Sequence, residues 1–136
     1  MKAIIRFFLI SILCISTVYA EDKVSPLSVA GATTVTPEKA KELFDKGVLF
    51  VDVRRESEYE AGRIPGAVNL ELEKVFKKES LMKQAKPDEP VVMYCNGPKC
   101  MRSSEASEKA VSWGFTKVYY LREGFPAWQS AGYPVE

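Results

Sequence analysis

The sequence contains no histidine, and this absence excludes several kinds of active site. The chain has no His-based general acid or base, no Ser-His or Cys-His dyad and no His-ligated metal site. Its three cysteines, Cys14, Cys95 and Cys100, are too few for a disulfide framework or a four-thiolate zinc site. Catalysis would have to come from cysteine, serine, carboxylate, lysine or arginine side chains. No metal and no cofactor is expected.

The sequence also lacks an excess of charge of either sign. Lys and Arg total 19 and Asp and Glu total 18, so the formal net charge is +1. A chain without a basic excess has little to neutralise a phosphate backbone, so no nucleic-acid partner is expected. With 136 residues, 46% hydrophobic and 27% charged, the composition is typical of one globular domain, which we expect to be a monomer.

No hydrophobic run near the amino terminus reaches the roughly 20 residues that span a bilayer. Residues 7–18 are mostly apolar, the basic residues Lys2 and Arg6 precede this run, and Val18-Tyr19-Ala20 resembles a signal-peptidase site. We therefore expect residues 1–20 to be a signal peptide that is removed. The protein is then expected to be exported, to a bacterial periplasm, without membrane attachment after cleavage.

The rest of the chain divides into a short linker and one domain. Residues 21–33 are small and polar without periodicity, which predicts a linker before a domain over 34–136. In the domain, the apolar runs 48–53 and 90–94 are typical of strands buried on both faces. Because helical segments alternate with these strands, we predict an α/β fold with a parallel sheet covered on both faces.

Two of the helices have clear boundary signals. Thr36 followed by Pro37 predicts a helix start, with Thr36 as the N-cap, and Gly47 predicts its end. A second helix is expected over 103–113, because apolar residues recur there with helical spacing and Gly114 follows.

The chemistry is expected in the loop after the strand 90–94. Cys95 follows that strand, and ligands of open parallel sheets bind beyond the carboxyl ends of the strands. A loop before a helix N-terminus can turn its N–H groups inward to bind an anion, and Lys99 and Arg102 add positive charge. We therefore expect Cys95 to have a lowered pKa and to exist as a thiolate. The alternative is a structural cysteine that forms a loop disulfide with Cys100.

Three stretches in order resemble the single-domain rhodanese (sulfurtransferase) family. Residues 51–69 contain VDVR, EY and GRIPGAVN, similar to the family motif DVR-x-x-x-E-[FY]-x-x-GHIPGA-x-N. Residues 95–103, CNGPKCMRS, correspond to the cysteine loop of the family. Residues 121–135, which begin LREGFPAW and end GYPV, are similar to L-x-GG-x-x-AW-x-x-x-G-x-PV. The resemblance covers about 34–136 and implies a five-stranded parallel sheet with helices on both faces.

The resemblance implies that Cys95 is catalytic: it accepts a sulfane sulfur as a persulfide and passes it to a thiophilic acceptor. Backbone N–H groups would hold the negative charge. These N–H groups are expected from Asn96, Gly97, Lys99, Cys100, Met101 and Arg102. The side chain of Arg102 is the expected anion clamp. Asp52 and Arg54 are expected to support the site through an ion pair, for which Glu58 is the candidate partner of Arg54.

The loop is longer than in many single-domain members, which show C-x-x-G-x-R-S. Here Arg102 lies seven residues after Cys95, and the loop is similar to that of a subgroup with a CNGPxCxRS-type sequence. A longer loop makes a wider cradle, by which we mean the ring of backbone N–H groups around the substrate. Such a cradle admits a small sulfur-containing anion or a protein-borne persulfide as the donor, and a protein as a possible acceptor.

Two other functions stay open at this point. Cys95 and Cys100 are five residues apart, so the protein is alternatively a thiol–disulfide protein that cycles this pair. A disulfide across so small a loop adds only about 2 kcal/mol, which suits regulation or protection better than stability. The other alternative is a binding module that kept the fold without catalysis. A cysteine phosphatase is disfavoured, because no Asp or Glu between Asn96 and Ser104 is available to protonate a leaving group.

Overall fold

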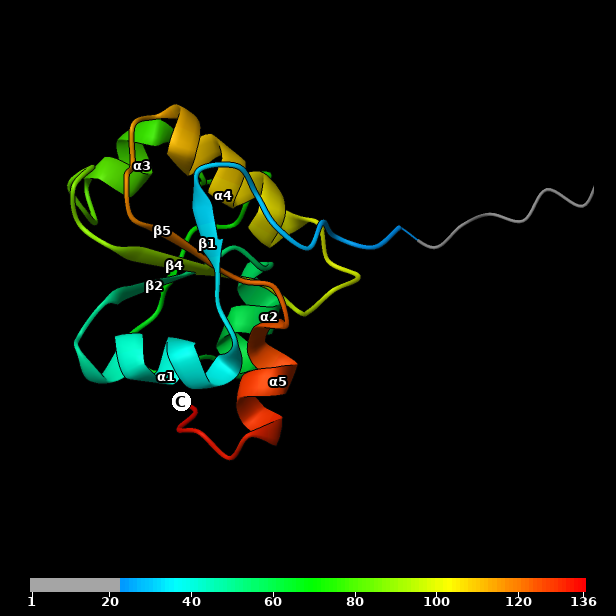
Figure 1. Cartoon of the computed structure of the whole chain (residues 1–136). Helices are drawn as coiled ribbons and strands as arrows, with labels where there is room; N and C mark the ends of the chain where they lie inside the picture. Colours follow the sequence, from blue (N-terminus) through cyan, green and yellow to red (C-terminus); the bar gives the residue numbers. More distant parts are fainter. Residues whose placement is uncertain (1–22) are drawn as a thin grey trace, which may run out of the picture.

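A parallel sheet lies at the centre of the molecule, with α3 and α4 on one face and α1, α2 and α5 on the other (Figure 1). The structure is a computed structural model and describes residues 23–136. The strands are β1 (Ala32–Thr34), β2 (Leu49–Asp52), β3 (Val68–Asn69), β4 (Val91–Tyr94) and β5 (Val118–Leu121). The helices are α1 (Pro37–Asp45), α2 (Glu56–Ala61), α3 (Lys78–Met82), α4 (Arg102–Ser112) and α5 (Gly124–Ser130). The five strands lie in the order β1-β5-β4-β2-β3 and pair in parallel, which confirms the predicted fold.

The central strand β4 contributes to two hydrophobic cores. Val91 and Met93 join the core beside α3 and α4, whereas Val92 and Tyr94 join the core beside α1 and α5. This alternation follows from the period of two along a strand. Because both faces of β4 are covered, the strand consists of apolar residues and tyrosine, as its sequence predicts.

Local sequence signals place the helix ends within one or two residues. Thr36 caps α1, and its Oγ1 accepts a hydrogen bond from the N–H of Lys39 at 3.2 Å. Gly47 follows the end of this helix with φ +79°, a conformation that suits glycine. The helix predicted over 103–113 begins and ends one residue earlier, at Arg102 and Ser112. These predicted boundaries are confirmed to within two residues. They could be predicted because a cap or a glycine acts on the backbone only a few residues away.

The described part of the predicted linker packs on the domain, in contrast to the prediction. The N–H of Ser25 donates to the carbonyl of Pro98 at 2.7 Å, and Tyr120 Oη donates to the carbonyl of Pro26 at 3.0 Å. Strand β1 begins at Ala32, inside the stretch expected as linker. The sequence does not signal this packing, because it depends on hydrogen bonds to backbone far along the chain.

The predicted signal peptide, residues 1–20, lies outside the described residues. It therefore stays a prediction, together with cleavage after Ala20. Among residues 23–136, no helix is both long enough and apolar enough to cross a membrane.

Candidate active site

Cys95 lies where the connections of the sheet change direction. From β2 the chain moves outward to β3, whereas from β4 it moves outward to β5, so the carboxyl ends of β2 and β4 flank this switch point. In open parallel sheets, ligands bind outside such a point. Cys95 directly follows β4, and Arg54 lies two residues after β2. The fold therefore brings together the two segments that the sequence analysis selected.

The loop from Cys95 to the start of α4 keeps most of its backbone N–H groups free. The N–H of Cys100 donates to the carbonyl of Gly97 at 2.9 Å, so it is not offered to an anion in this conformation, in contrast to the prediction. The other five N–H groups of the predicted cradle have no acceptor among residues 23–136. They belong to Asn96, Gly97, Lys99, Met101 and Arg102. Five free N–H groups before a helix N-terminus can bind an anion.

Gly124, the first residue of α5, packs directly against the backbone of this loop at Cys95 and Gly97. Its φ is +67°, and a Cβ at this position would collide with the carbonyl oxygen of Cys95 and lie 2.7 Å from the N atom of Gly97. The N–H of the next residue, Phe125, donates to the same Cys95 carbonyl at 2.9 Å. Only glycine allows α5 to approach so closely, so Gly124 positions the backbone of Cys95.

The two cysteines of the loop form a disulfide. Cys95 and Cys100 are bonded, with their Cα atoms 6.3 Å apart. The two residues differ in burial: Cys95 is fully buried, at 0% exposure, and Cys100 is partly exposed. The sequence left open whether this disulfide forms, and the structure is that of the oxidised protein. The lowered pKa expected for Cys95 concerns the reduced form and stays a prediction.

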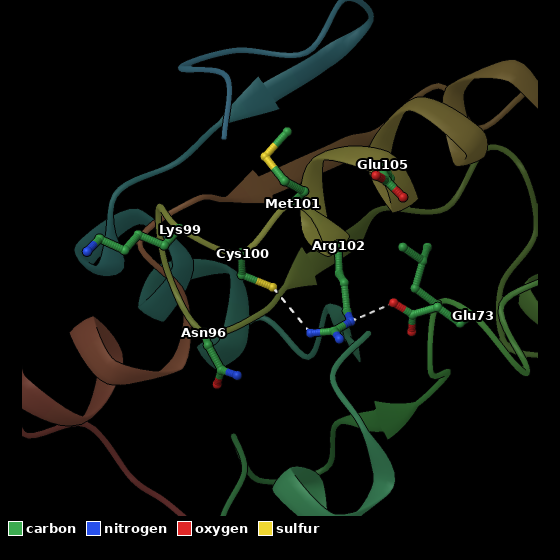
Figure 2. A pocket seen from close by; sticks show the side chains of 8 residues that line it. Glu73, Asn96, Lys99, Cys100, Met101, Arg102 and Glu105 are labelled. Carbon is green, nitrogen blue, oxygen red and sulfur yellow. Dashed lines mark hydrogen bonds and ion pairs between the residues drawn. The ribbon is translucent and has the colours of Figure 1, made fainter. Parts of the chain in front are cut away.

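Arg102 lies beside the disulfide and is held from outside the loop (Figure 2). Its Nε donates to Glu73 Oε1 at 2.9 Å, and its Nη1 lies 3.9 Å from Sγ of Cys100. Burial by itself would raise the pKa of Glu73, but the hydrogen bond and the charge of Arg102 outweigh it and lower this pKa. The expected anion clamp is thus paired with a carboxylate that an incoming anion would displace.

A pocket of about 440 Å³ opens beside the loop (Figure 2). It is lined by Leu72, Glu73, Asn96, Lys99, Cys100, Met101, Arg102 and Glu105. Five of these residues were predicted as site residues. The lining carries charges of both signs, and Cys95 is buried and reaches the lining only through its bond to Cys100. Within the part of the chain that the structure describes, no group of three or more His, Cys, Asp or Glu side chains is arranged to hold a metal ion.

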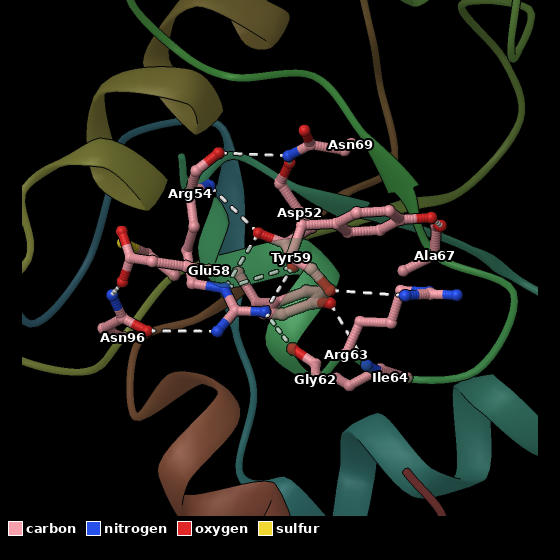
Figure 3. Close-up of polar contacts among 12 residues, drawn as sticks. Asp52, Arg54, Glu58, Tyr59, Gly62, Arg63, Ile64, Ala67, Asn69 and Asn96 are labelled. Carbon is pink, nitrogen blue, oxygen red and sulfur yellow. Dashed lines mark hydrogen bonds and ion pairs between the residues drawn. The ribbon is translucent and has the colours of Figure 1, made fainter. Parts of the chain in front are cut away.

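Asp52 and Arg54 form a buried ion pair on the other side of the loop (Figure 3). Arg54 Nη2 donates to Asp52 Oδ2 at 2.7 Å and to the carbonyl of Gly62, also at 2.7 Å. The guanidinium carbon lies 4.6 Å from the ring centre of Phe125. Burial by itself would lower the pKa of Arg54, but the hydrogen bond and the charge of Asp52 raise it. Asp52, and not Glu58, is therefore the ion-pair partner of Arg54, and the supporting role of the pair stays a prediction.

Asn96 connects this ion pair to the cysteine loop (Figure 3). Its Oδ1 accepts from Arg54 Nη1 at 3.3 Å, and its Nδ2 donates to Glu58 Oε2. Glu58 therefore contacts the loop through Asn96 instead of pairing with Arg54. The residue after Cys95 is held on both sides of its amide group, which restricts the loop at the point where it leaves β4.

Sequence reasoning missed two residues that shape the site. Glu73 lies outside the three motifs, and no local pattern indicates that it pairs with Arg102. Gly124 carried a signal, because it matches the second glycine of the family ending L-x-GG, and glycine is the residue that allows a positive φ or a close backbone approach. Both contacts join segments that are distant in the chain.

The fold and the loop define a class of protein: an α/β domain with a cysteine at the carboxyl edge of its sheet, followed by a loop with free backbone N–H groups. The model of the rhodanese-like domain matches residues 36–131. The chain belongs to the rhodanese family, as the resemblance predicted.

Curated relatives and solved structures agree with this assignment. The chain is 33% identical to the thiosulfate sulfurtransferase GlpE of Pseudomonas fluorescens over 102 residues, which cover 75% of this chain and 88% of that protein. It is 32% identical to the HTH-type transcriptional regulator Rv0324 of Mycobacterium tuberculosis, over 88% of this chain but only 54% of the regulator. The crystal structure of the BH2092 protein from Bacillus halodurans matches with a TM-score of 0.68 and 26% identity, over 77% of each chain.

Proposed function

We propose that this protein is a sulfurtransferase or persulfide carrier whose reduced Cys95 accepts and donates a sulfane sulfur. The observation that carries the proposal is the position of Cys95, directly after β4, in a loop with five free N–H groups and before the 11-residue helix α4. This environment favours a thiolate and an anionic substrate without a histidine base. The similarity to a thiosulfate sulfurtransferase supports the same chemistry.

The reaction requires only the cysteine and the loop. With thiosulfate as the donor, the Cys95 thiolate attacks the outer sulfur, the S–S bond of thiosulfate breaks, and sulfite leaves with the electron pair. The product is a Cys95 persulfide, whose negative charge the free N–H groups and the N-terminus of α4 stabilise. A thiophilic acceptor such as cyanide then attacks the outer sulfur, leaves as thiocyanate and regenerates the Cys95 thiolate.

Intact-protein mass spectrometry tests this proposal. The protein is first reduced, because the Cys95–Cys100 disulfide blocks the nucleophile, and is then mixed with thiosulfate or with a polysulfide. The wild type is expected to gain one sulfur atom and to lose it on addition of cyanide. The variant Cys95→Ser is expected to gain none. Uptake of the same sulfur by Cys95→Ser would contradict the assignment of the nucleophile.

A second function is favoured by the disulfide itself. A protein that cycles Cys95 and Cys100 between disulfide and dithiol would exchange electrons with partner thiols instead of transferring sulfur. The variant Cys100→Ser distinguishes the two functions. Under the sulfurtransferase proposal it still accepts and transfers sulfur and loses its sensitivity to oxidation. Under the thiol–disulfide function it loses activity entirely, as Cys95→Ser does.

We also infer that the protein acts after export, because residues 1–20 have the charge and hydropathy pattern of a signal peptide. N-terminal sequencing of the exported protein is expected to begin at Glu21. Recovery of a membrane-bound form that keeps Lys2 would contradict the inference. In an oxidising compartment, the disulfide would form readily and a reductant would be needed for activity.

A further inference from the structure

The two cysteines of the disulfide differ in exposure, and only Cys100 lines a pocket. Cys95 is 0% exposed and belongs to the core beside α3 and α4, whereas Cys100 is partly exposed and lines the pocket of about 440 Å³ (Figure 2). Thiol–disulfide exchange begins when a thiolate reaches one sulfur of the bond, so access decides which sulfur is attacked. A nucleophile that enters this pocket meets Cys100.

We propose that this pocket binds a low-molecular-weight zwitterionic thiol, whose thiolate attacks Sγ of Cys100 and releases Cys95 as the leaving group. The proposal names the reductant that activates the site, and its physiological meaning rests on the proposed sulfurtransferase function. The reduction step itself needs no sulfur transfer, so the two proposals can fail separately.

The size and charge of the pocket indicate this class of ligand. A volume of about 440 Å³ is within the range of about 300–1,000 Å³ that is usual for small-molecule sites. The lining offers the cations Lys99 and Arg102 and the carboxylates Glu73 and Glu105. An amino-acid or short-peptide thiol carries a carboxylate and an ammonium group and can pair with both kinds of residue. A neutral thiol can use neither.

The exchange takes place in two steps, in which the small thiol attacks Cys100 and Cys95 is released. The thiolate sulfur bonds to Sγ of Cys100, the disulfide bond breaks, and the electron pair leaves on Sγ of Cys95. A second thiol then attacks the mixed disulfide and departs as a small-molecule disulfide, and Cys100 takes up the proton. Two thiols are oxidised and the protein disulfide is reduced by two electrons.

Arg102, with Nη1 3.9 Å from Sγ of Cys100, attracts the incoming thiolate. Cys95 is the expected leaving group, because its loop runs into the N-terminus of α4, whose dipole favours a thiolate.

Trapping of the intermediate tests which sulfur is attacked. The oxidised wild type is mixed briefly with glutathione and quenched with an excess of iodoacetamide. Trypsin cleaves after Lys99 and thereby separates Cys95, in peptide 84–99, from Cys100, in peptide 100–102. We expect glutathione on peptide 100–102 and the alkyl group on peptide 84–99. The reverse labelling, or a protein purified without reductant that carries two free thiols, would overturn the proposal.

The kinetics of reduction test the binding pocket. Glutathione and 2-mercaptoethanol are compared at equal thiolate concentration. We expect the rate with glutathione to saturate and to be about tenfold higher at low concentration, within the range of two exposed ion pairs. The double variant Lys99→Gln/Glu105→Gln should lose this preference. The matched control is Glu108→Gln/Lys109→Gln, which makes the same charge changes on exposed residues of α4 outside the pocket and should keep it.

Two outcomes of this comparison would overturn the proposal. One is equal and unsaturable rates with the two thiols, which would mean that the pocket does not select its reductant. The other is a disulfide that resists both small thiols and yields only to a protein dithiol of the thioredoxin type, which would make the reductant a protein. Either result leaves the sulfur-uptake experiment on the fully reduced protein unaffected, so the proposed function is tested independently.

Discussion

Two arginines flank the cysteine loop, and they are held in opposite ways. Arg54 is 3% exposed and bonded to a buried carboxylate, a backbone carbonyl and the amide of Asn96, and it also stacks on an aromatic ring. The side chain of Arg102 is 20% exposed, and its ion-pair partner Glu73 is 54% exposed. Every contact of Arg54 is internal to the fold, whereas Arg102 faces a pocket.

The difference suits the two arginines to different roles: support of the loop for Arg54 and, under the proposed function, binding of the substrate for Arg102. A buried, fully bonded guanidinium cannot change partners without leaving an unpaired charge, so Arg54 restricts the loop. An exposed ion pair is worth little and exchanges easily, so Arg102 can leave Glu73 for an anionic substrate. The sequence predicts the same roles for these residues, but only their contacts provide the physical reason.

Removal of Arg54 should have the largest effect. Arg54→Met leaves the carboxylate of Asp52 buried without its counter-charge, so we expect the free energy of unfolding to fall by about 3–5 kcal/mol. The matched variant Arg102→Met should lose less than about 1 kcal/mol. Urea unfolding of both variants with the disulfide intact measures the difference. Equal losses would end the distinction between the two arginines.

Disruption of the close contact between Gly124 and the backbone of Cys95 should cause the next largest loss of stability. Gly124→Ala adds a Cβ where the Cys95 carbonyl lies and also strains a residue with φ +67°. The control is Gly47→Ala, because Gly47 has a similar φ of +79° but open space around it. The control should lose about 1–2 kcal/mol from strain alone. Gly124→Ala should lose more and, because it moves Cys95, should slow sulfur uptake by about 10- to 100-fold. Normal uptake by a folded Gly124→Ala protein would show that α5 does not position the loop.

The link between Arg54 and the loop predicts a smaller effect. Asn96→Ala removes the hydrogen bonds that Asn96 makes with Arg54 and Glu58, at a loss of about 1 kcal/mol. Asn69→Ala is the control, because Asn69 donates to the carbonyls of Asp52 and Arg54 without touching the loop. Both variants should lose similar stability in urea unfolding. Only Asn96→Ala should slow sulfur uptake, and equal uptake by the two would contradict the proposed link.

The ion pair of Arg102 predicts the smallest effect on stability and a clear dependence on pH. Because the pKa of Glu73 is lowered from 4.5 in the folded protein, the ion pair stabilises fully above that value. The stabilisation is lost as the pH falls through the lowered pKa. The difference in unfolding free energy between wild type and Arg102→Gln should therefore disappear in acid. The same variant should raise the KM for thiosulfate with kcat little changed. A stability difference that persists below the lowered pKa would mean that the side chain of Arg102 stabilises by packing.

Much of the fold could be predicted because its signals are local. The apolar runs around β2 and β4, the N-cap Thr36 and the glycine after α1 act within a few residues. The register and order of the strands could not be read in this way, because they depend on how helices fill the space between distant segments. The packing of Ser25 against Pro98 escaped prediction for the same reason.

By itself, the sequence determined the class of fold and the absence of a histidine base, and it indicated Cys95 as the candidate nucleophile. Composition excludes chemistry wherever a residue type is missing, and three motifs in order identify a family. Only the tertiary structure decided which partner each charge has: Asp52 for Arg54 and Glu73 for Arg102. It also decided that Cys95 is buried, whereas Cys100, to which it is bonded, is partly exposed. Ion pairs and access depend on distances between residues that the chain separates, and those distances exist only after the sheet and its helices have packed.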